Sequence, residues 1–536
     1  MAYNKPGIEV SQIQERMTPT LFAPDLEAVV IGESNYWQPM TEATGTYLTA
    51  AQTEIAVSGI NSEYPSVEGH ENLVLVDLLT ATGVRKPLVK TTDFTIATEN
   101  ELSTITILSG IQVDSANITT AAAVYVGYRA DNISGRGFKT LESLSDIQNL
   151  YGSTNSWNPL AYGATLAMAN AGATINVYGI SGVTSAANVL AALGDLEARE
   201  VYAMSLLEQK YSASNTAGYL STHVTTQSSA INKKERIAFV CKATEFNGTA
   251  YYEDSTQKVA TATAVQLSNV AHANKRLFSI HPDTVYVDET RHISTINPTW
   301  IAASFLNTAP TVFGLGDRVC LFRNNVKINN IAYLKGQKIT AAIYAAIKDY
   351  ITSEDKTLSV WAPVPGYYQT AAIVGQVVGK TPEQPLTNVP ISGFAKTKGS
   401  NDYFSEANLN TMAEGGTYII NELTTNTLVC RHQVATDMSS VAKRELSVTT
   451  ALDFTAKFIR TAFSPYIGRY TISPSFIKLA NTILVGIGMY LKREGYINDL
   501  QVLSITQDSI NPDTLLVEVN ILVKYPVNYI KLKLIF

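Results

Sequence analysis

Between residues 136 and 281 the sequence alternates short apolar runs with helical patterns, and this alternation restricts the fold more than any other feature of the chain. Helical periodicity lies near 185–198, 215–231 and 262–273, and the apolar runs around these segments are TINVYGI, VYAMSLL, RIAFVCK and RLFSI. Neighbouring parallel strands need a crossover connection, which is usually a helix. The sequence therefore predicts an α/β layer with a largely parallel sheet.

The layer is expected to include more than these runs. LEAVVIGES predicts a buried strand, and TLESLSDIQNLYG and NPLAYGATLAMANAG predict two helices, the second ended by Gly172. Residues 38–135 differ, because short β-branched runs separated by Gly, Asn and Asp predict a small β-sandwich with little helix. Residues 282–355 are less regular; KITAAIYAAIKDYI predicts a helix, and LSVWAP predicts a further strand just after them.

The last third has an α+β pattern. Two helices are expected there, and the later one begins at Pro474, with Ser473 as N-cap and Gly495 just past its end. The runs LQVLSIT and LLVEVNILVKY flank a turn at NPD, which predicts a hairpin. The earlier helix, ELSVTTALDFTAKFIRTAF, is expected to present one face formed by Val448, Leu452, Thr455, Ile459 and Ala462.

The sequence ends on KYPVNYIKLKLIF, which predicts an apolar β-strand with no turn or polar tail after it. Ile530, Leu532, Leu534 and Phe536 point to one side, and Lys531 and Lys533 point to the other. An uncovered strand has unpaired backbone groups on at least one edge, which proteins normally cover. Either another part of this chain covers the strand, or another chain does.

Length and composition limit the class of protein. A chain of 536 residues is too long for one core, so two to four domains are expected. Charged residues make up 16%, well below the usual quarter, which suggests that much of the surface is buried against partners. A net charge of −6 and the absence of Lys/Arg blocks argue against nucleic-acid binding.

Membrane insertion and export are not expected either. The N-terminal MAYNKPGIEV lacks the apolar core of a signal peptide, and the longest apolar run, Ile483 to Leu491, is too short to span a bilayer. Cys241, Cys320 and Cys430 are odd in number and far apart, so they imply no disulfide framework. These features predict a soluble protein made in a reducing compartment.

Local catalytic motifs are missing from the sequence. GQVVGKT, at residues 375–381, has three residues between its glycines where a P-loop needs four, and prolines follow it, so a loop is expected there. FGLGDRV and GIGMYL lack the third glycine of a dinucleotide fingerprint. The six histidines show no metal-binding spacing, and no Gly-x-Ser-x-Gly motif occurs. We expect no catalytic residue, cofactor or metal, although residues assembled from distant segments stay open.

Four stretches in order resemble the tail sheath proteins of contractile phages and related injection machines. They are the opening NKPGIEVSQI, the strand AVVIGES, the block GFKTLESLSDIQNLYGSTNSWNPLAYGATLAMANAGATINVYGI, and LVCRHQVATDMSSVAKRELSVTTALDFTAKFIRTAFSPYIGRY. The loop VPGYYQTAAIVGQVVGKTPEQPLTNVPISGF is also similar to one in that family. The sequence departs from the family at Ala171, where a second Gly is usual, and at Tyr178-Gly179, where Arg-Val is frequent. The likeness covers about half of the chain.

The resemblance implies a multi-domain α+β fold. It would have a sheath core with an α/β layer, an inserted β-sandwich-like outer domain, and extended β arms at both ends. The expected division is an N-terminal linking arm at 1–20, the start of the core at 21–37, the outer domain at 38–135, the α/β domain at 136–360 with a variable insertion near 282–355, the C-terminal core at 361–528, and the C-terminal linking arm at 529–536.

The resemblance also implies a function without catalysis. A tail sheath subunit polymerises into a helical, six-fold tube of stacked hexameric rings around an inner tail tube, and contraction drives that tube through the host envelope to deliver the genome. The implied partners are further copies of the chain, the tail tube protein, and baseplate and tail terminator proteins. The implied location is the virion tail, assembled in the cytoplasm of a bacterial host. The alternatives are the sheath of a phage-like injection particle, another virion or baseplate component, and, last, an α/β enzyme.

Three groups of residues are then implied to mediate assembly. In the family, terminal arms add strands to a hairpin of a neighbouring subunit. From the residues alone, pairing within the chain and pairing between chains are equally open. The donors would be Ile8, Glu9 and Val10 in one arm and Ile530, Lys531, Leu532, Lys533, Leu534 and Phe536 in the other. The acceptor hairpin would comprise Val502, Leu503, Ile505, Leu516, Val517, Val519 and Ile521, and the candidates to face the tube are Lys478, Lys492 and Arg493.

Overall fold

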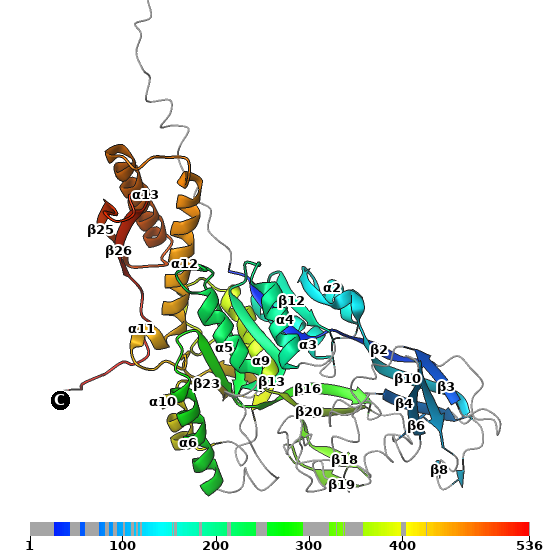
Figure 1. Cartoon of the computed structure of the whole chain (residues 1–536). Helices are drawn as coiled ribbons and strands as arrows, with labels where there is room; N and C mark the ends of the chain where they lie inside the picture. Colours follow the sequence, from blue (N-terminus) through cyan, green and yellow to red (C-terminus); the bar gives the residue numbers. More distant parts are fainter. Residues whose placement is uncertain are drawn as a thin grey trace, which may run out of the picture. The chain divides into compact units, whose positions relative to one another are not determined.

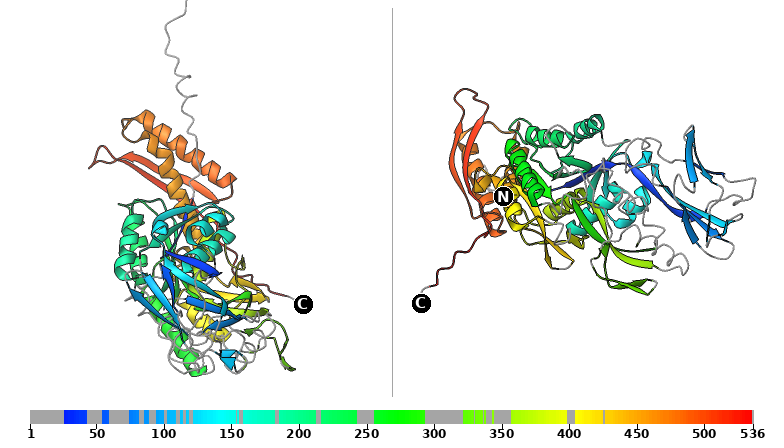
Figure 2. Two further views of the ribbon diagram at one scale, coloured as in Figure 1. Left: turned by 90° about the vertical axis from the view of Figure 1, so that its right-hand side faces the viewer. Right: turned by 90° about the horizontal axis from the view of Figure 1, so that it is seen from below.

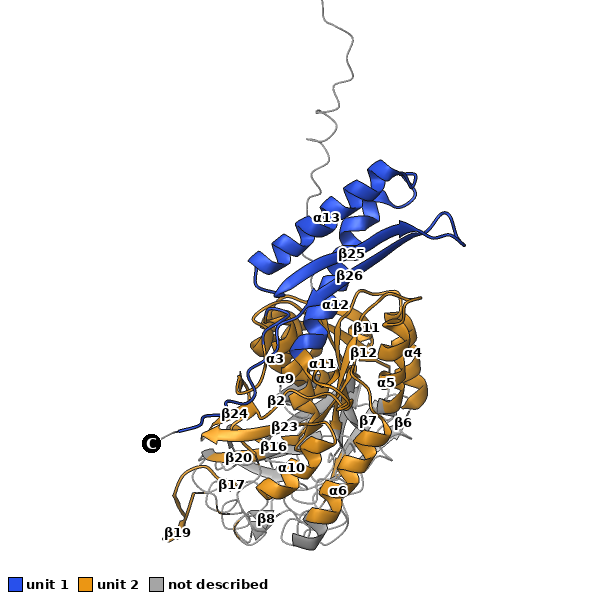
Figure 3. Ribbon diagram, turned by 90° about the vertical axis from the view of Figure 1, so that its left-hand side faces the viewer, with its two compact units in different colours: residues 1–26, 381–384, 447–536 blue, residues 27–380, 385–446 orange. Residues whose placement is uncertain are grey.

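The computed structural model divides into two compact units, shown in Figure 3. Unit 1 comprises residues 1–26, 381–384 and 447–536, and unit 2 comprises residues 27–380 and 385–446. The structure describes residues 26–42, 54–58, 74–80, 85–88, 94–99, 102–108, 112–113, 116–117, 121–152, 154, 158–181, 185–211, 216–242, 255–292, 321–328, 330–335, 337, 343, 357–397, 404–424 and 426–534.

A nine-stranded sheet forms the centre of unit 2 (Figure 1). Its order is β11-β12-β1-β13-β14-β15-β23-β24-β21, and the six strands from β12 to β23 run parallel. The prediction of a largely parallel sheet is confirmed. The strands are β1 (Ala28–Glu33), β11 (Gly137–Leu141), β12 (Ile175–Ile180), β13 (Ala203–Tyr211), β14 (Ile237–Lys242), β15 (Leu277–His281), β21 (Pro390–Ile391), β23 (Thr417–Thr424) and β24 (Thr427–Cys430).

Helices cover both faces of this sheet, which explains why its strands are apolar throughout. On one face, Val29 and Ile31 pack with Val189 of α4 and Val224 of α5. The other face packs against α3 and α9. The helices of unit 2 are α2 (Leu144–Tyr151), α3 (Pro159–Ala171), α4 (Ala186–Leu196), α5 (Thr216–Gln227), α6 (Ser255–Ala271), α9 (Tyr367–Val378), α10 (Glu406–Glu414) and α11 (Val441–Arg444), with the 3-10 turn η1 (Ile133–Gly135).

The helices α3 and α9 pack backbone to backbone. A Cβ on Gly375 would overlap the carbonyl oxygen of Ala167, and a Cβ on Gly379 would overlap that of Ala171. The two glycines, four residues apart, thus allow close packing of the two helices and do not form a phosphate-binding loop. The prediction of a loop at GQVVGKT is wrong for residues 375–378, because they form the last turn of α9.

The chain between Asn35 and Asp131 forms strands in the part that the structure describes. They make a four-stranded sheet of order β2-β10-β4-β5, a three-stranded sheet of order β3-β7-β6, and the pair β8-β9. The predicted β texture agrees with this, and the predicted domain boundaries stay predictions. The strands are β2 (Asn35–Glu42), β3 (Glu54–Ser58), β4 (Val74–Thr80), β5 (Arg85–Leu88), β6 (Phe94–Glu99), β7 (Leu102–Ile107), β8 (Gln112–Val113), β9 (Ala116–Asn117) and β10 (Ala121–Asp131).

Two smaller sheets complete unit 2. One has the order β17-β20-β16-β22, and the other is the hairpin β18-β19. The predicted strand LSVWAP lies within β20, whereas the helix expected at KITAAIYAAIKDYI falls almost wholly outside the described residues, as does FGLGDRV. The strands are β16 (Thr284–His292), β17 (Leu321–Phe322), β18 (Val326–Ile328), β19 (Ile331–Tyr333), β20 (Thr357–Pro365) and β22 (Lys396–Thr397).

Unit 1 packs two long helices with a β-hairpin (Figure 2). Ser473 caps α13 by accepting a hydrogen bond from the Phe476 amide at 3.2 Å, and Gly495 follows the helix with a φ of 83°. Both agree with the sequence prediction. The elements are α12 (Leu446–Phe463), the 3-10 turn η4 (Ser464–Tyr466), α13 (Pro474–Arg493), β25 (Asp499–Gln507) and β26 (Leu515–Leu522).

Two sequence predictions about helices need correction. On α12, Phe454 and Phe458 are buried in the unit 1 core, while Leu452, Ile459 and Ala462 of the predicted face are only partly buried. Much of this helix is buried on several sides, so one apolar stripe does not identify its inner face. The helix α6 begins at Ser255, seven residues earlier than residue 262, because the polar start STQKVAT hides its periodicity.

The helix α13 has 20 residues and is apolar enough, by length and composition, to cross a membrane, unlike the shorter run Ile483–Leu491 within it. It is the one such helix among the described residues. Ile483, Ile487 and Leu491 lie in the core of unit 1, and a core helix of a soluble protein meets the same criterion. The expectation that the protein does not insert into membranes stays a prediction.

Candidate assembly surface

The hairpin of unit 1 is an antiparallel pair with no third strand among the described residues. Val502 lies opposite Val519, and Ile505 lies opposite Val517, with a bulge at Leu503 between the two pairs. The turn Asp508–Thr514 is closed by a hydrogen bond from the Asp508 amide to the Thr514 carbonyl oxygen at 2.9 Å. Each strand therefore has a free backbone edge that could accept another strand.

The two faces of the hairpin differ in what they contact. The inner face packs on α13, and Leu500, Val502, Val519 and Ile521 join the core of unit 1. Its outer face is exposed and includes Leu516 and Leu522, with Glu518 between them. A strand added at an edge of the hairpin would place one set of its alternating side chains on this outer face, where Glu518 could pair with basic residues.

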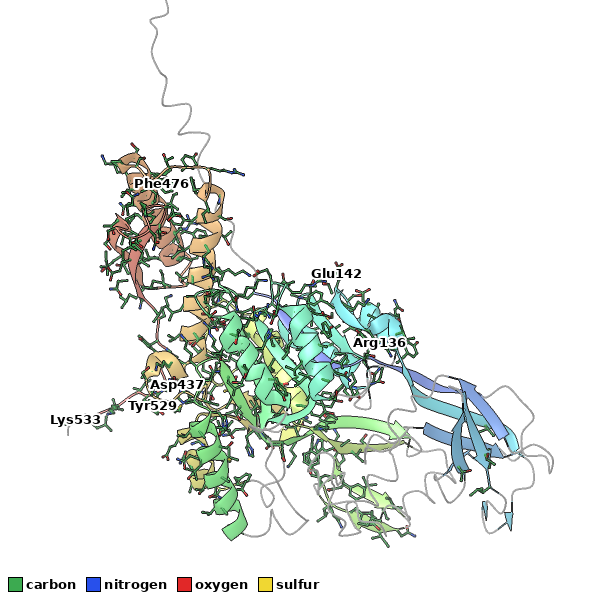
Figure 4. All side chains as sticks on the ribbon, in the orientation of Figure 1. Arg136, Glu142, Asp437, Phe476, Tyr529 and Lys533 are labelled. Carbon is green, nitrogen blue, oxygen red and sulfur yellow. The ribbon has the colours of Figure 1, made fainter. Side chains whose placement is uncertain are left out.

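The C-terminal segment after β26 is exposed and has no strand partner in the described part of the chain. Ile530 is 85% exposed and Leu532 79% exposed, and Leu534 is similarly open to solvent. Figure 4 shows Tyr529 and Lys533 on this segment, beyond the body of the hairpin and its helices. Over the described residues 529–534 of the predicted strand, the single chain shows no strand, because a strand needs a partner for its hydrogen bonds.

Not all predicted arm residues can be placed. Ile8, Glu9 and Val10 lie outside the described residues, as does Phe536. Lys531 and Lys533 are exposed on the described part of the segment. The structure brings the predicted acceptor residues together in one hairpin, and it does not pair the segment 529–534 with that hairpin within the chain.

The three cations proposed to face the tube lie exposed on α13. Two of them already have partners in the same unit. Lys492 Nζ lies 3.4 Å from Asp499 Oδ1, and Arg493 Nη2 lies 2.8 Å from Glu494 Oε1. Exposed pairs of this kind contribute about 0–1 kcal/mol, so a partner could displace them. Lys478 stands four residues before Thr482 on the same helix, and its carbonyl oxygen accepts the Thr482 hydroxyl at 3.0 Å.

A pocket of about 460 Å³ in unit 2 was not predicted from the sequence. Phe138, Tyr178, Asp195, Ala198 and Arg199 line it. The Tyr178 hydroxyl donates to Asp195 Oδ2 at 2.5 Å, and the Arg199 guanidinium lies 4.7 Å from the centre of the Phe138 ring. Burial, and then the bond to Asp195, raise the pKa of Tyr178 well above its ordinary value. These residues come from β11, β12 and the end of α4, so no local sequence motif predicts the pocket.

A buried basic pair lies beside this pocket. Arg236 is fully buried, and its Nη2 donates to the carbonyl oxygens of Leu196 and Arg199 at 2.7 Å each. Its Nη1 lies 2.5 Å from His223 Nε2. Burial, and then the charge of Arg236, lower the pKa of His223 to about 4, so this histidine is neutral at pH 7. The pair closes the C-terminal end of α4 and has the character of a structural rather than a catalytic group.

Groups that could hold a metal were sought among the described residues, and no cluster of three or more His, Cys, Asp or Glu occurs there. Cys241 and Cys430 are buried as free thiols. Burial raises the pKa of Cys430 above its ordinary range, which makes this thiol unreactive. No catalytic arrangement emerges from these residues.

Comparisons with known proteins found similar solved structures but no family model and no curated sequence that matches. No protein-family model matches the chain, and no curated protein sequence matches it. The sheath structure of the anti-feeding prophage, in the contracted state, aligns over 75% of this chain and 88% of its own, with a TM-score of 0.47 and 13% identity. The contracted sheath of PVC, an extracellular contractile injection system, aligns over 75% and 88%, with a TM-score of 0.47 and 12% identity.

A sheath tail protein from Listeria innocua aligns over 97% of this chain and 96% of its own, with a TM-score of 0.41 and 8% identity. These structural neighbours are sheath proteins of contractile injection systems and of the phage type, the family that the sequence motifs resemble. Because these TM-scores lie below 0.5, the function of this chain has to be argued from its own residues.

Proposed function

We propose that this chain is a structural sheath subunit that links to further copies of itself through its C-terminal segment. The observation that carries the proposal is an apolar segment, 529–534, that is exposed in a chain whose hairpin β25-β26 has open edges. A donor strand and an acceptor sheet in one molecule, left unpaired with each other, are the two halves of strand addition between copies.

The side chains support the same pairing. Ile530, Leu532 and Leu534 alternate with Lys531 and Lys533, so one side of the added strand would be apolar and the other basic. The basic side would lie on the outer face of the hairpin beside Glu518, and the apolar side would then lie on the inner face, which carries Val519 and Ile521. A donor strand that leaves its own subunit makes a head-to-tail contact, and such contacts build open helical arrays.

The proposal extends to the assembly and its work. The array would be a helical tube of hexameric rings around an inner tail tube, with baseplate and terminator proteins at its ends. The N-terminal arm around Ile8 to Val10 would supply a second link. Contraction would release free energy as more surface is buried between subunits, without nucleotide hydrolysis. Location in the tail of a phage or of a phage-like injection particle, and delivery of a genome, belong to the same proposal.

The decisive experiment tests whether the segment crosses between copies. One batch carries Leu532→Cys and the other Leu516→Cys, both with Cys320→Ser, since Cys241 and Cys430 are buried. The batches are mixed and treated with a short bismaleimide linker. A cross-linked dimer that appears only in the mixture shows exchange, because each batch alone lacks one of the two cysteines of the tested pair. A mixture of Leu532→Cys with Val441→Cys is the matched control.

Negative-stain microscopy completes the test. The full chain is expected to form striated hollow tubes, and a chain ending at Asn528 is expected to stay as single particles. Tubes formed equally well by the shortened chain, or a mixture that gives no cross-linked dimer, would contradict the proposal. Uniform small particles together with a bound small molecule would favour the α/β enzyme instead.

A further inference from the structure

Three helices on one side of the unit 2 sheet present a surface that is almost free of charge. They are α4, α5 and α6, and Figure 3 shows them following one another along that side. The helices α4 and α5 pack together, and at the end of α6 the Asn274 side-chain amide donates to Thr225 Oγ1 of α5 at 2.9 Å. We name this surface the three-helix face.

Most outward residues of these helices are apolar or uncharged. Leu190 of α4, Tyr219 of α5, and Val259, Leu267 and Val270 of α6 are all exposed. The sequences of the three helices contain two charged residues, Asp195 and Lys258. Solvated helices normally carry a charged outer face, so this composition is typical of a surface that is covered by protein.

The size of the three-helix face suits a specific contact. The helices α4, α5 and α6 have 11, 12 and 17 residues, which gives lengths of about 16, 18 and 25 Å. With each helix about 10 Å across, the area is roughly 600 Å², about three-quarters of the ~800 Å² that each partner contributes to a standard interface.

The pocket at the end of α4 adds a directional feature to this face. Arg199 lies over the Phe138 ring, and the carboxylate that lines the pocket, Asp195, accepts the Tyr178 hydroxyl. A guanidinium held flat on an aromatic ring presents its donors to a planar anion such as a carboxylate. The pocket is thus suited to an Asp or Glu side chain at the rim of an interface.

We propose that the three-helix face binds a second copy of this chain, with a carboxylate of that copy entering the Arg199 pocket. The chain itself fits as the occupant: it has 46 acidic and 40 basic residues, so a copy offers carboxylates in excess, and only 16% of its residues are charged. The proposal rests on the proposed function, because copies linked by their arms meet at high effective concentration. It adds a rigid contact that needs no terminal arm.

The test places a charge in the centre of the face. Leu190→Glu and Leu267→Glu are compared with Val441→Glu on α11, since Leu190 is 48% and Val441 44% exposed and both lie in unit 2. The concentration at which tubes form is expected to rise about ten-fold or more for the face variants and to stay within about two-fold for the control. Arg199→Glu is expected to act like the face variants, and Arg199→Lys to act more weakly.

Several outcomes separate the two proposals. Tubes that form at the wild-type concentration in both face variants overturn the three-helix contact and leave strand exchange intact. If the wild-type chain forms no tubes, the contact is read instead from sedimentation of the full chain. Concentration-dependent dimers that Leu190→Glu abolishes support the contact, and a full chain that stays monomeric overturns it. Should Leu190→Glu lower the melting temperature, Ala191→Glu on the same exposed face replaces it.

Discussion

The helix pair α3–α9 and the C-terminal segment are both apolar in sequence, but the first is buried and the second is exposed. In the pair, glycines bring two backbones into contact, and nearly every residue of α9 from Tyr367 to Val377 is buried. In the segment, Ile530 and Leu532 are open to solvent and pair with no strand among the described residues. The apolar side chains of the helix pair are buried within one chain, whereas those of the segment are exposed to solvent.

This difference suggests that the stability of the single chain and its association with other copies depend on different regions of the molecule. Changes in the buried pair should alter folding, and changes in the exposed segment should alter only association. Four predictions test that separation, in order of their expected effect on the stability of the single chain.

The largest loss is expected from Gly375→Ala. The new methyl group would overlap the Ala167 carbonyl oxygen, which is backbone and cannot rotate away. Overpacking of this kind costs about 1–3 kcal/mol, and a backbone clash belongs at the upper end. Chemical denaturation of the full chain measures it. Gly194→Ala on α4, where a Cβ meets nothing within 4 Å, is the control and should be neutral or slightly stabilising. Equal stability of the two variants would mean that α3 and α9 are not closely packed.

The next effect is a dependence on pH. His223 has a pKa of about 4 in the folded chain, against about 6.5 when unfolded, so the unfolded chain binds a proton first. Its contribution is fully present above pH ~6.5 and is lost as the pH falls from ~6.5 to ~4, a total of at most about 3 kcal/mol.

Denaturation at pH 7.5 and pH 4.5, for the wild type and for His223→Gln, isolates this contribution from that of other groups. The variant should lose less stability than the wild type over that interval. If both lose the same amount, His223 titrates normally and the buried pair with Arg236 does not form.

A smaller effect is expected at the start of α13. Ser473→Ala removes the side-chain acceptor of the Phe476 amide and should cost about 1 kcal/mol. Hydrogen exchange of the first turn of α13 would rise about five-fold as a result. Thr482→Ala, which removes an exposed hydroxyl further along the same helix, should leave exchange in that turn unchanged.

The smallest effect on stability, and the largest on assembly, is expected for Ile530→Glu with Leu532→Glu. Both side chains are exposed, so the free energy of unfolding should change by less than about 0.5 kcal/mol. Tube formation should nevertheless be lost, because the apolar side of the donor strand would carry two negative charges. A marked fall in melting temperature would show that the segment packs within its own chain.

The sequence allowed much of the fold to be predicted, for identifiable reasons. The parallel sheet followed from apolar runs and helices in alternation, and α13 followed from Ser473, Pro474 and Gly495. The end of α9 could not be predicted, because a helix buried on all sides has no polar stripe, and the prolines after Gly379 favour a loop.

Some features of the candidate assembly surface could likewise be predicted from the sequence, and others could not. The hairpin and the alternating segment were visible because their pattern is local. The Arg199 pocket was not, because Phe138, Tyr178 and Arg199 are far apart in the sequence and meet only in the folded sheet. The three-helix face was hinted at only by the low overall charge of the chain.

Lys531 and Lys533, at alternate positions of the exposed segment, also bear on how a newly made chain stays in solution. If two such segments paired in parallel register, each lysine would lie beside its counterpart, and the two pairs of like charges would disfavour the pairing. We therefore expect the lysines to disfavour association between identical segments while leaving each segment able to pair with an acidic acceptor. Salt screens that repulsion, so storage of the free subunit should favour low ionic strength.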